Sequence, residues 1–172
     1  MYRARAGRRA PLKASARTGQ LLYLTAAGAY GLDRLTKILA ESHLDGRPPI
    51  DLIPGVLRLR FTTNPGGAFG LFGGLTWLFV VVSVVVIGAV LYAARDLPDR
   101  PTAIALGLVL AGALGNVTDR FVRGPGFSGE VVDFIDLHVW PVFNVADMAI
   151  VVGAAILVLS GLRRRPDEPP GG

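Results

Sequence analysis

Charged residues in the middle of the chain occur in short groups, and long stretches without charge separate them. One uncharged stretch covers residues 71–94 and is rich in valine. An α-helix rises about 1.5 Å per residue, so a helix of this length covers the roughly 30 Å hydrocarbon core of a bilayer. Valine would also suit a strand, but the length of the stretch favours a helix. The pattern therefore predicts a transmembrane helix.

Three further segments follow the same pattern, and together the four predict an all-α membrane protein built as a bundle of four transmembrane helices. We expect the helices at about residues 21–40, 72–94, 101–118 and 143–162. The first carries Asp33, Arg34 and Lys37 in its second half, and the last must begin near Phe143 to be long enough to span. The membrane domain then comprises residues 18–162, between a basic tail at 1–17 and a second tail at 163–172.

The distribution of charge gives an orientation to this bundle. The net charge of +5 arises largely from two basic runs that flank the spans: Arg3, Arg5, Arg8, Arg9, Lys13 and Arg17 at one end, and Arg163, Arg164 and Arg165 at the other. Basic residues beside a span mark its cytoplasmic end, so both termini are predicted to be cytoplasmic, and the charge does not indicate a nucleic-acid partner. A cleaved signal peptide ending near residues 27–29 is the alternative for the N-terminus, although the apolar pattern continues beyond that point.

Two longer connections, at about residues 41–74 and 119–142, then lie on the opposite side of the membrane. Residues 57–61 alternate apolar and basic side chains, which predicts a half-buried strand, and the turn-forming sequence Asn-Pro-Gly-Gly follows at 64–67. We therefore expect a small sheet or hairpin at the membrane surface. In the third span Gly107, Ala111 and Gly115 recur every four residues, which favours close packing of a neighbouring helix.

Three groups of ionisable or amide side chains lie within or beside the spans, where such groups are costly and usually functional. Asp33 and Lys37 are four residues apart on the first helix and can form an ion pair. The other two groups stand at the ends of spans. One is Asn116, Asp119 and Arg120 on the third helix, and the other is Asn144 and Asp147 on the fourth. Asp119 and Arg120 are also compatible with a salt-bridged helix terminus. Each group is therefore a candidate for a site or for a structural ion pair.

Asp133 lies in the sequence Val-Val-Asp-Phe, where large apolar side chains enclose the acid. Burial raises the pKa of a carboxyl group, and a second carboxylate nearby raises one of the two further. Asp133 and Asp147 could then share one proton, activate a water and protonate a carbonyl oxygen, which is acyl hydrolysis without a covalent intermediate. The residues alone fit a catalytic pair and a polar network equally well, and Asp136 competes with Asp133 for the role.

Other chemistries are limited by the residues that the chain contains. It has no cysteine, so a thiol enzyme would lack its nucleophile. It has only two histidines and no His-Glu-x-x-His sequence, so a membrane zinc protease would lack its metal ligands. Residues 126–129, Gly-Phe-Ser-Gly, match a short motif of intramembrane serine proteases, with His138 as the base. A small proton or ion transporter and a noncatalytic assembly factor are the alternatives from other classes.

Five motifs in order resemble those of the lipoprotein signal peptidase (signal peptidase II) family. Residues 33–37 resemble its Asp-x-x-x-Lys, 64–70 its Asn-x-Gly-x-Ala-Phe-Gly, and 112–120 its Gly-Ala-x-Gly-Asn-x-x-Asp-Arg. Residues 131–134 resemble its Val-Val-Asp-Phe, and 143–147 its Phe-Asn-x-Ala-Asp. The loop at 123–130 is longer than is usual in the family, and the connection from Asp133 to Asp147 is shorter.

The resemblance implies a membrane aspartic endopeptidase whose catalytic pair is Asp133 and Asp147. It implies supporting or substrate-positioning roles for Asp33, Lys37, Asn64, Gly66, Asn116, Asp119, Arg120, Asn144 and Ala146. It also implies an extracytoplasmic β-cradle formed partly by residues near 50–70, inhibition by the cyclic peptide globomycin, and no metal or other cofactor. The expected partners are membrane lipids and prolipoproteins with a diacylglyceryl-modified lipobox cysteine, cleaved on the amino side of that cysteine. We expect a monomer in the bacterial cell membrane, with its site towards the extracytoplasmic face.

Overall fold

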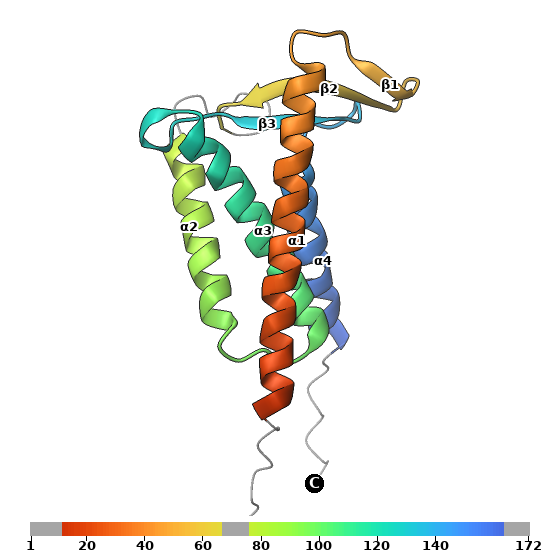
Figure 1. The fold of residues 1–172 in the computed structure, drawn as a ribbon. Helices are drawn as coiled ribbons and strands as arrows, with labels where there is room; N and C mark the ends of the chain where they lie inside the picture. Colours follow the sequence, from red (N-terminus) through yellow and green to blue (C-terminus); the bar gives the residue numbers. More distant parts are fainter. Residues whose placement is uncertain (1–11, 67–75, 164–172) are drawn as a thin grey trace, which may run out of the picture.

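The computed structural model describes residues 12–66 and 76–163, which form four helices and a small sheet (Figure 1). The elements in chain order are α1 (Leu12–Leu44), β1 (Ile50–Ile53), β2 (Leu57–Asn64), α2 (Thr76–Ala93), α3 (Arg100–Val122), the short 3-10 helix η2 (Pro125–Phe127), β3 (Val131–Asp136) and α4 (Val145–Arg163). Residues 67–70 of the second motif and the basic residues at 1–11 and 164–165 lie outside the described part.

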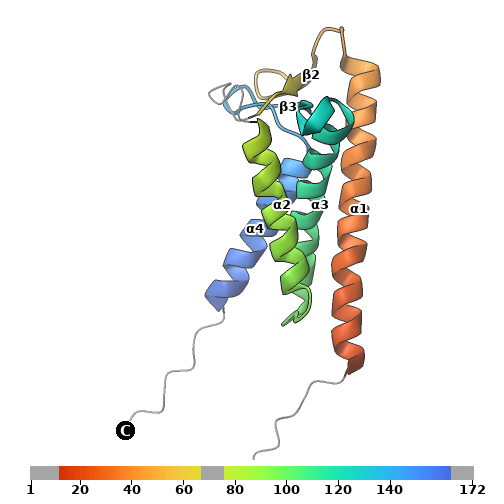
Figure 2. The ribbon, with the colours of Figure 1, turned by 90° about the vertical axis from the view of Figure 1, so that its left-hand side faces the viewer.

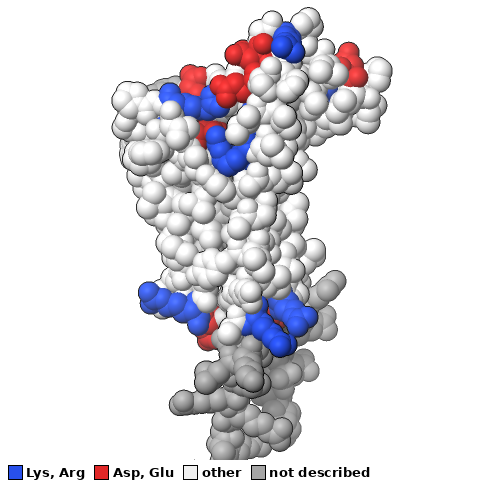
Figure 3. Space-filling view, viewed as in Figure 1, with Lys and Arg blue, Asp and Glu red and all other residues white. Residues whose placement is uncertain are grey.

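The helices form an elongated bundle, and the sheet covers one end of it (Figures 1 and 2). The first residue of α1 and the last of α4 lie at the other end. Helices α2, α3 and α4 are long and apolar enough to cross a membrane. Lysine, arginine and acidic side chains gather at the two ends of the molecule, and an uncharged belt separates them (Figure 3). The expectation of a four-helix membrane bundle with a small sheet is confirmed.

Two of the observed helices extend beyond the apolar segments that predicted them. α1 begins at Leu12 and ends at Leu44, so at about 1.5 Å per residue it is longer than the membrane is thick. α3 continues through Asp119 and Arg120 to Val122, because both side chains are buried against the bundle and need not end the helix. At its start the Asp99 side chain caps α3 by accepting the Thr102 N–H at 2.8 Å, ahead of Pro101 in the first turn.

The predicted strand at 57–61 is β2, and it is the central strand of a three-stranded antiparallel sheet. Thr62 lies opposite Asp133 of β3, and Arg58 lies opposite Asp136. On the other side β2 pairs with β1, whose four residues are all exposed. This register brings the end of β2, at Asn64, beside the start of β3.

Helix α3 lies in the middle of the bundle and contacts the other three helices. Its predicted small-residue stripe faces α1, because a Cβ atom at Gly107 would lie 2.6 Å from the Leu22 carbonyl oxygen and one at Gly115 would lie 2.5 Å from Asp33 Oδ2. Gly112, on the side of α4, is packed even more closely. A Cβ atom there would lie 2.3 Å from the carbonyl oxygen of Ala146.

Gly112→Ala is therefore expected to force α3 and α4 apart and to destabilise the protein by about 1–3 kcal/mol, the usual cost of overpacking. Thermal unfolding of the purified protein in detergent measures the effect. Gly88→Ala in α2 is the matched control, since a Cβ atom at that position would have no atom from another described part of the chain within 4 Å. Alanine is the better helix former, so the control should unfold at the same or a higher temperature. Equal loss of stability in both variants would contradict the close approach.

Candidate active site

Asp133 is buried on β3 and accepts hydrogen bonds from two side-chain amides. Asn144 Nδ2 donates to its Oδ1 at 2.6 Å, and Asn64 Nδ2 donates to its Oδ2 at 3.1 Å. Neighbouring residues of a strand point to opposite faces, so Val132 and Phe134 pack towards the end of α1 while Asp133 points away from it. Both carboxylate oxygens of Asp133 are thus held in place.

Asp147 lies in the first turn of α4 and forms a reciprocal cap with Asn144. The Asn144 side-chain oxygen accepts the Asp147 N–H at 3.0 Å, while Asp147 Oδ2 accepts the Asn144 N–H at 3.3 Å. This arrangement is a capping box, which satisfies backbone donors that have no partner at the start of a helix. A further such donor, the N–H of Ala146, binds Asp33 Oδ1 of α1 at 2.9 Å. The local fold of α4 therefore positions Asp147 precisely.

The orientation of each amide is fixed by a group outside the pair of aspartates. Lys37 has only donors, and its Nζ binds Asn116 Oδ1 at 3.1 Å, so Asn116 Nδ2 must point to Asp147 Oδ1, which it binds at 2.8 Å. Likewise the N–H of Gly66 binds Asn64 Oδ1 at 3.0 Å and leaves Asn64 Nδ2 for Asp133. The Nδ2 atoms of both amides therefore donate to the carboxylates.

A buried cluster of ion pairs supports these amides from the side of α1. Lys37 Nζ lies 3.1 Å from Asp33 Oδ2 and 2.8 Å from Asp119 Oδ2, and all three side chains are almost fully buried. Asp119 also pairs with Arg34, and its Oδ2 accepts the N–H of Val132 of β3 at 3.3 Å. The predicted Asp33–Lys37 ion pair is confirmed. Asp119 is also ion-paired. Its partners in α1 are Arg34 and Lys37, and the adjacent Arg120 is not among its partners.

Arg120 instead lines a cavity of about 470 Å³ together with the two aspartates. Its guanidinium lies over the Phe79 ring, 5.7 Å from the ring centre, and its Nη1 binds the Asn116 carbonyl oxygen at 3.3 Å. Among the described residues it contacts no carboxylate within 4 Å, and its buried Nε has no hydrogen-bond partner. The cavity wall also contains apolar side chains of α2, of α4 and of the segment before α4, namely Val82, Trp140, Pro141, Val142, Phe143 and Ile150.

The two aspartates that line the cavity also interact electrostatically. Burial raises the pKa of Asp133, and the negative charge of Asp147 raises it further, to about 7. The hydrogen bonds from Asn64 and Asn144 act in the opposite direction but do not outweigh burial. A carboxyl group with this pKa holds a proton for much of the time near neutral pH. Asp133 can therefore act as an acid.

Asp136, the competing candidate, is held at a different place. Its Oδ2 lies 2.8 Å from Arg58 Nε and 2.6 Å from Arg60 Nε, and its Oδ1 accepts the N–H of His138 at 2.8 Å. Burial would raise the pKa of Asp136, but these hydrogen bonds outweigh it and hold the pKa well below its ordinary range. It is not among the residues that line the cavity. Asp136 therefore serves as an ion-pair partner within the sheet.

The serine motif at 126–129 is not arranged for catalysis. Ser128 is exposed, and its hydroxyl group donates to the Pro125 carbonyl oxygen at 2.8 Å. His138 lies beyond β3, and no hydrogen bond joins its ring to Ser128 in the described residues.

Sequence reasoning missed part of the ion-pair cluster. Arg123 binds Glu41 through Nη1 and Nη2 at 3.0 and 2.6 Å, and its Nε lies 3.6 Å from Asp119 Oδ1. The spacing of four residues between Asp119 and Arg123 was an available signal for that contact. Arg34 follows Asp33 directly, but its contact with Asp119 joins two helices and has no local signal in the sequence.

Comparison with known proteins agrees with this architecture. Residues 25–163 match the family described as signal peptidase (SPase) II. The chain is 47% identical over 140 residues to a lipoprotein signal peptidase of Rhodococcus jostii, covering 81% of this chain and 71% of that one. It is 37% identical over 142 residues to a lipoprotein signal peptidase of Desulfitobacterium hafniense, covering 81% and 91%. A solved structure described as a bacterial membrane enzyme superposes with a TM-score of 0.74 at 26% identity, covering 88% of this chain and 93% of that one.

A helical bundle of this kind, with a sheet at one end and buried carboxylates beneath it, defines a multi-pass bacterial membrane enzyme. The class of reaction that this enzyme catalyses follows from the family match, which covers most of the chain. The chain belongs to the signal peptidase II family, the lipoprotein signal peptidases, which are aspartic endopeptidases.

Proposed function

We propose that Asp133 and Asp147 form the catalytic dyad of this peptidase and that they act on a water molecule held between them. The observation that carries this proposal is their convergence on one cavity, where three asparagine side chains hold both carboxylates. The charge of Asp147 raises the pKa of Asp133, so the pair keeps one proton between them near neutral pH. One protonated and one ionised carboxyl group is the state that general acid–base hydrolysis requires.

In the first step, the oxygen of the water attacks the scissile carbonyl carbon while Asp147 accepts a proton from that water. At the same time Asp133 donates its proton to the carbonyl oxygen. The resulting tetrahedral diol then collapses. Its C–N bond breaks, Asp147 gives its proton to the departing nitrogen, and Asp133 regains the proton of a diol hydroxyl group. The dyad returns to its starting state, and neither aspartate forms a covalent bond to the substrate.

Arg120 and the asparagines are suited to hold the peptide during these steps. The Arg120 guanidinium lines the cavity and, among the described residues, pairs with no carboxylate within 4 Å, so it can bind a substrate carbonyl oxygen without displacing a carboxylate. The apolar part of the wall can accept the hydrophobic side chains of a signal peptide. These features support cleavage of diacylglyceryl-modified prolipoproteins on the amino side of the lipobox cysteine, with the acyl chains remaining in the bilayer.

The proposed topology places the sheet and the dyad on the extracytoplasmic side and both termini in the cytoplasm. The described ends of α1 and α4 lie together at the end opposite the sheet, and so does the connection from α2 to α3, which contains Arg95 and leads to Arg100 at the start of α3 (Figure 1). Basic residues favour the cytoplasmic side of a span. The protein is proposed to act as a monomer, because the described dyad and its supporting side chains all come from one chain.

The test of this function is cleavage of a synthetic prolipoprotein by the purified full-length protein in detergent. A precursor whose lipobox cysteine carries a diacylglyceryl group should be cut immediately before the cysteine, as shown by mass spectrometry of both products. The same precursor without the lipid group is the matched control and should remain intact, and globomycin should block the reaction. Equal cleavage of both precursors would overturn the proposed substrate class.

The raised pKa of Asp133 predicts how cleavage depends on pH. As the pH rises above about 7 the dyad loses its shared proton, so kcat/KM should fall about tenfold per pH unit on the alkaline side. Asn64→Ala removes a hydrogen bond that lowers the pKa of Asp133, so the alkaline limb should move to higher pH in that variant even if its maximal rate is reduced. If the alkaline limb of the kcat/KM profile lies at the same pH in Asn64→Ala as in the unaltered protein, Asp133 is not the group whose titration limits cleavage.

A further inference from the structure

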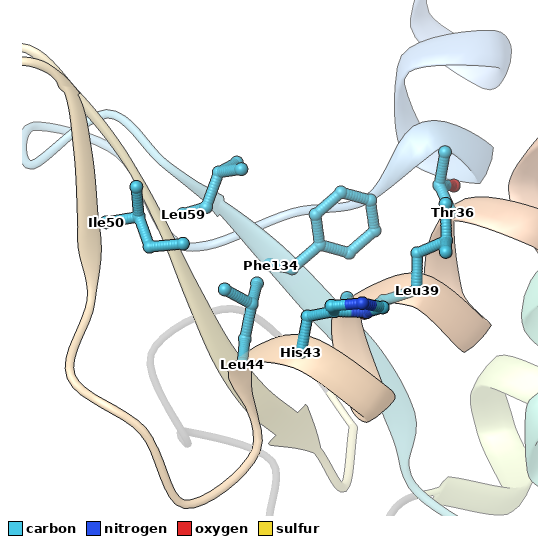
Figure 4. A pocket seen from close by; sticks show the side chains of 8 residues that line it. Thr36, Leu39, His43, Leu44, Ile50, Leu59 and Phe134 are labelled. Carbon is cyan, nitrogen blue, oxygen red and sulfur yellow. The ribbon is translucent and has the colours of Figure 1, made fainter.

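A second cavity lies on the opposite side of β3 from the dyad. It is an open groove of about 380 Å³ between the last turns of α1 and the face of the sheet that carries Phe134, a volume within the usual range for small-ligand sites. Phe134 of β3, Leu59 of β2 and Ile50 of β1 meet Leu39, His43 and Leu44 of α1 there (Figure 4). Phe134 follows Asp133 directly, so one strand separates the groove from the active-site cavity.

The groove presents hydrocarbon almost throughout. Only Thr36 and His43 contribute polar side chains, and both are engaged with their own helix. The Thr36 hydroxyl group donates to the carbonyl oxygens of Leu32 and Asp33 at 2.9 and 3.0 Å, and His43 Nδ1 lies 3.0 Å from the Leu39 carbonyl oxygen. A ligand of this groove is therefore apolar over the length that it buries.

The groove is continuous with the surface that α1 exposes to the bilayer. Leu32, Thr36, Leu39 and His43 follow one another at intervals of four, three and four residues, so they form a single stripe along α1. Leu32 and Leu39 are each about half exposed, and neighbouring Leu35 and Ile38 are exposed to a similar degree. The stripe begins within the predicted membrane span and leads upwards into the groove. Lipid chains that contact the stripe have a direct path into it.

We propose that the groove binds an acyl chain of a bilayer phospholipid from the leaflet on the side of the sheet. The bound chain packs against Phe134 and Leu59, fills the groove between α1 and the sheet, and supports β3 on the face opposite Asp133. This lipid is a component of the surrounding membrane and not the substrate. The site is therefore separate from the cavity that contains the dyad.

Fluorescence quenching by brominated lipids tests the proposal without substrate. The chain contains two tryptophans, Trp77 and Trp140, and replacing both by phenylalanine allows Phe134→Trp to serve as a single reporter. The full-length protein is placed in phosphatidylcholine vesicles whose lipids are brominated near the middle of one chain, or in unbrominated vesicles. Because Phe134 is only 7% exposed and lines the groove, bromine on a chain seated in the groove lies directly against the reporter. We expect the reporter to lose most of its fluorescence in the brominated vesicles.

Two exposed residues of β1 provide matched variants. Ile50 lines the groove and Ile53 does not, while their exposed fractions are nearly equal at 49% and 51%. Ile50→Glu places a charge at the groove and should restore the fluorescence of the reporter, whereas Ile53→Glu should leave the quenching unchanged. Leu59→Trp, in the same tryptophan-free background, provides a second reporter if the first does not fold. Absence of quenching at both reporters, equal quenching in both glutamate variants, or protection of the groove by a second copy of the chain would overturn the proposal.

Discussion

Replacing Asp147 by asparagine is expected to lower the cleavage rate of a lipidated precursor by at least about 100-fold and up to about 10,000-fold, the range that general acid–base groups contribute. Asparagine has nearly the same shape, and its side-chain oxygen can still accept the hydrogen bond from Asn116 Nδ2. It cannot take a proton from water, so the variant should fold and insert but not cleave. Asp133→Asn should be equally inactive, because an amide cannot supply the proton that the carbonyl oxygen needs.

Asp136→Asn is the control that distinguishes the dyad from a general loss of carboxylates. Asp136 binds Arg58 and Arg60 in the sheet, so its replacement should lower stability by about 1.5–3 kcal/mol, as expected for hydrogen bonds to charged groups. Its cleavage rate below the unfolding temperature should stay close to that of the unaltered protein. An active Asp147→Asn variant would overturn the proposed mechanism. An inactive Asp136→Asn variant beside an active Asp133→Asn variant would reassign the strand aspartate.

The largest effect on stability is expected from Lys37→Met. Methionine fills a similar volume, but the change leaves Asp33 and Asp119 buried without the ammonium group that lies between them. Removing one partner of a buried ion pair typically costs about 3–5 kcal/mol, because the remaining charge has lost its compensation. Thermal unfolding in detergent measures the loss. Activity should also fall, because Asn116 Oδ1 loses the hydrogen bond from Lys37 and keeps only the one from Asn144, so the amide that binds Asp147 is held less firmly.

Glu41→Gln is the matched control for this variant. It removes one charge from the same cluster, but Glu41 is 45% exposed and pairs with Arg123 at the surface. Exposed ion pairs contribute about 0–1 kcal/mol, so the control should unfold within a few degrees of the unaltered protein. If Lys37→Met were as stable as Glu41→Gln, the cluster around Lys37 would not be the electrostatic core that its burial indicates.

Much of the fold could be predicted because the membrane imposes a simple pattern on the sequence. The long apolar segments located four helices, and the alternation at residues 57–61 located β2. The ends of α1 and α3 could not be predicted by the same rule. Their charged residues do not mark the membrane boundary, since Asp33, Lys37, Asp119 and Arg120 are buried against other helices.

The site was predictable in its residues but not in its contacts. The motif at 131–134 named Asp133, while Asp136 remained a competing candidate, and only the register of β3 with β2 shows that Asp136 faces Arg58. The sequence likewise placed Arg120 beside Asp119, but Asp119 pairs with Arg34 and Lys37 while Arg120 lines the cavity. Contacts between residues that are far apart in the chain depend on how helices pack, and no local pattern encodes them.

The two aspartates also come from separate parts of the chain, and this has a consequence for biosynthesis. Asp133 belongs to the sheet, whereas Asp147 belongs to α4, which leaves the ribosome after α1, α2 and α3, and its cap Asn144 directly precedes that helix. A nascent chain that has inserted only α1 to α3 contains one aspartate of the pair and lacks the other. Under the proposed mechanism, hydrolytic activity can therefore arise only after α4 has entered the membrane and packed against α3, so a nascent chain that stops short of α4 cannot cut a protein that is exported beside it.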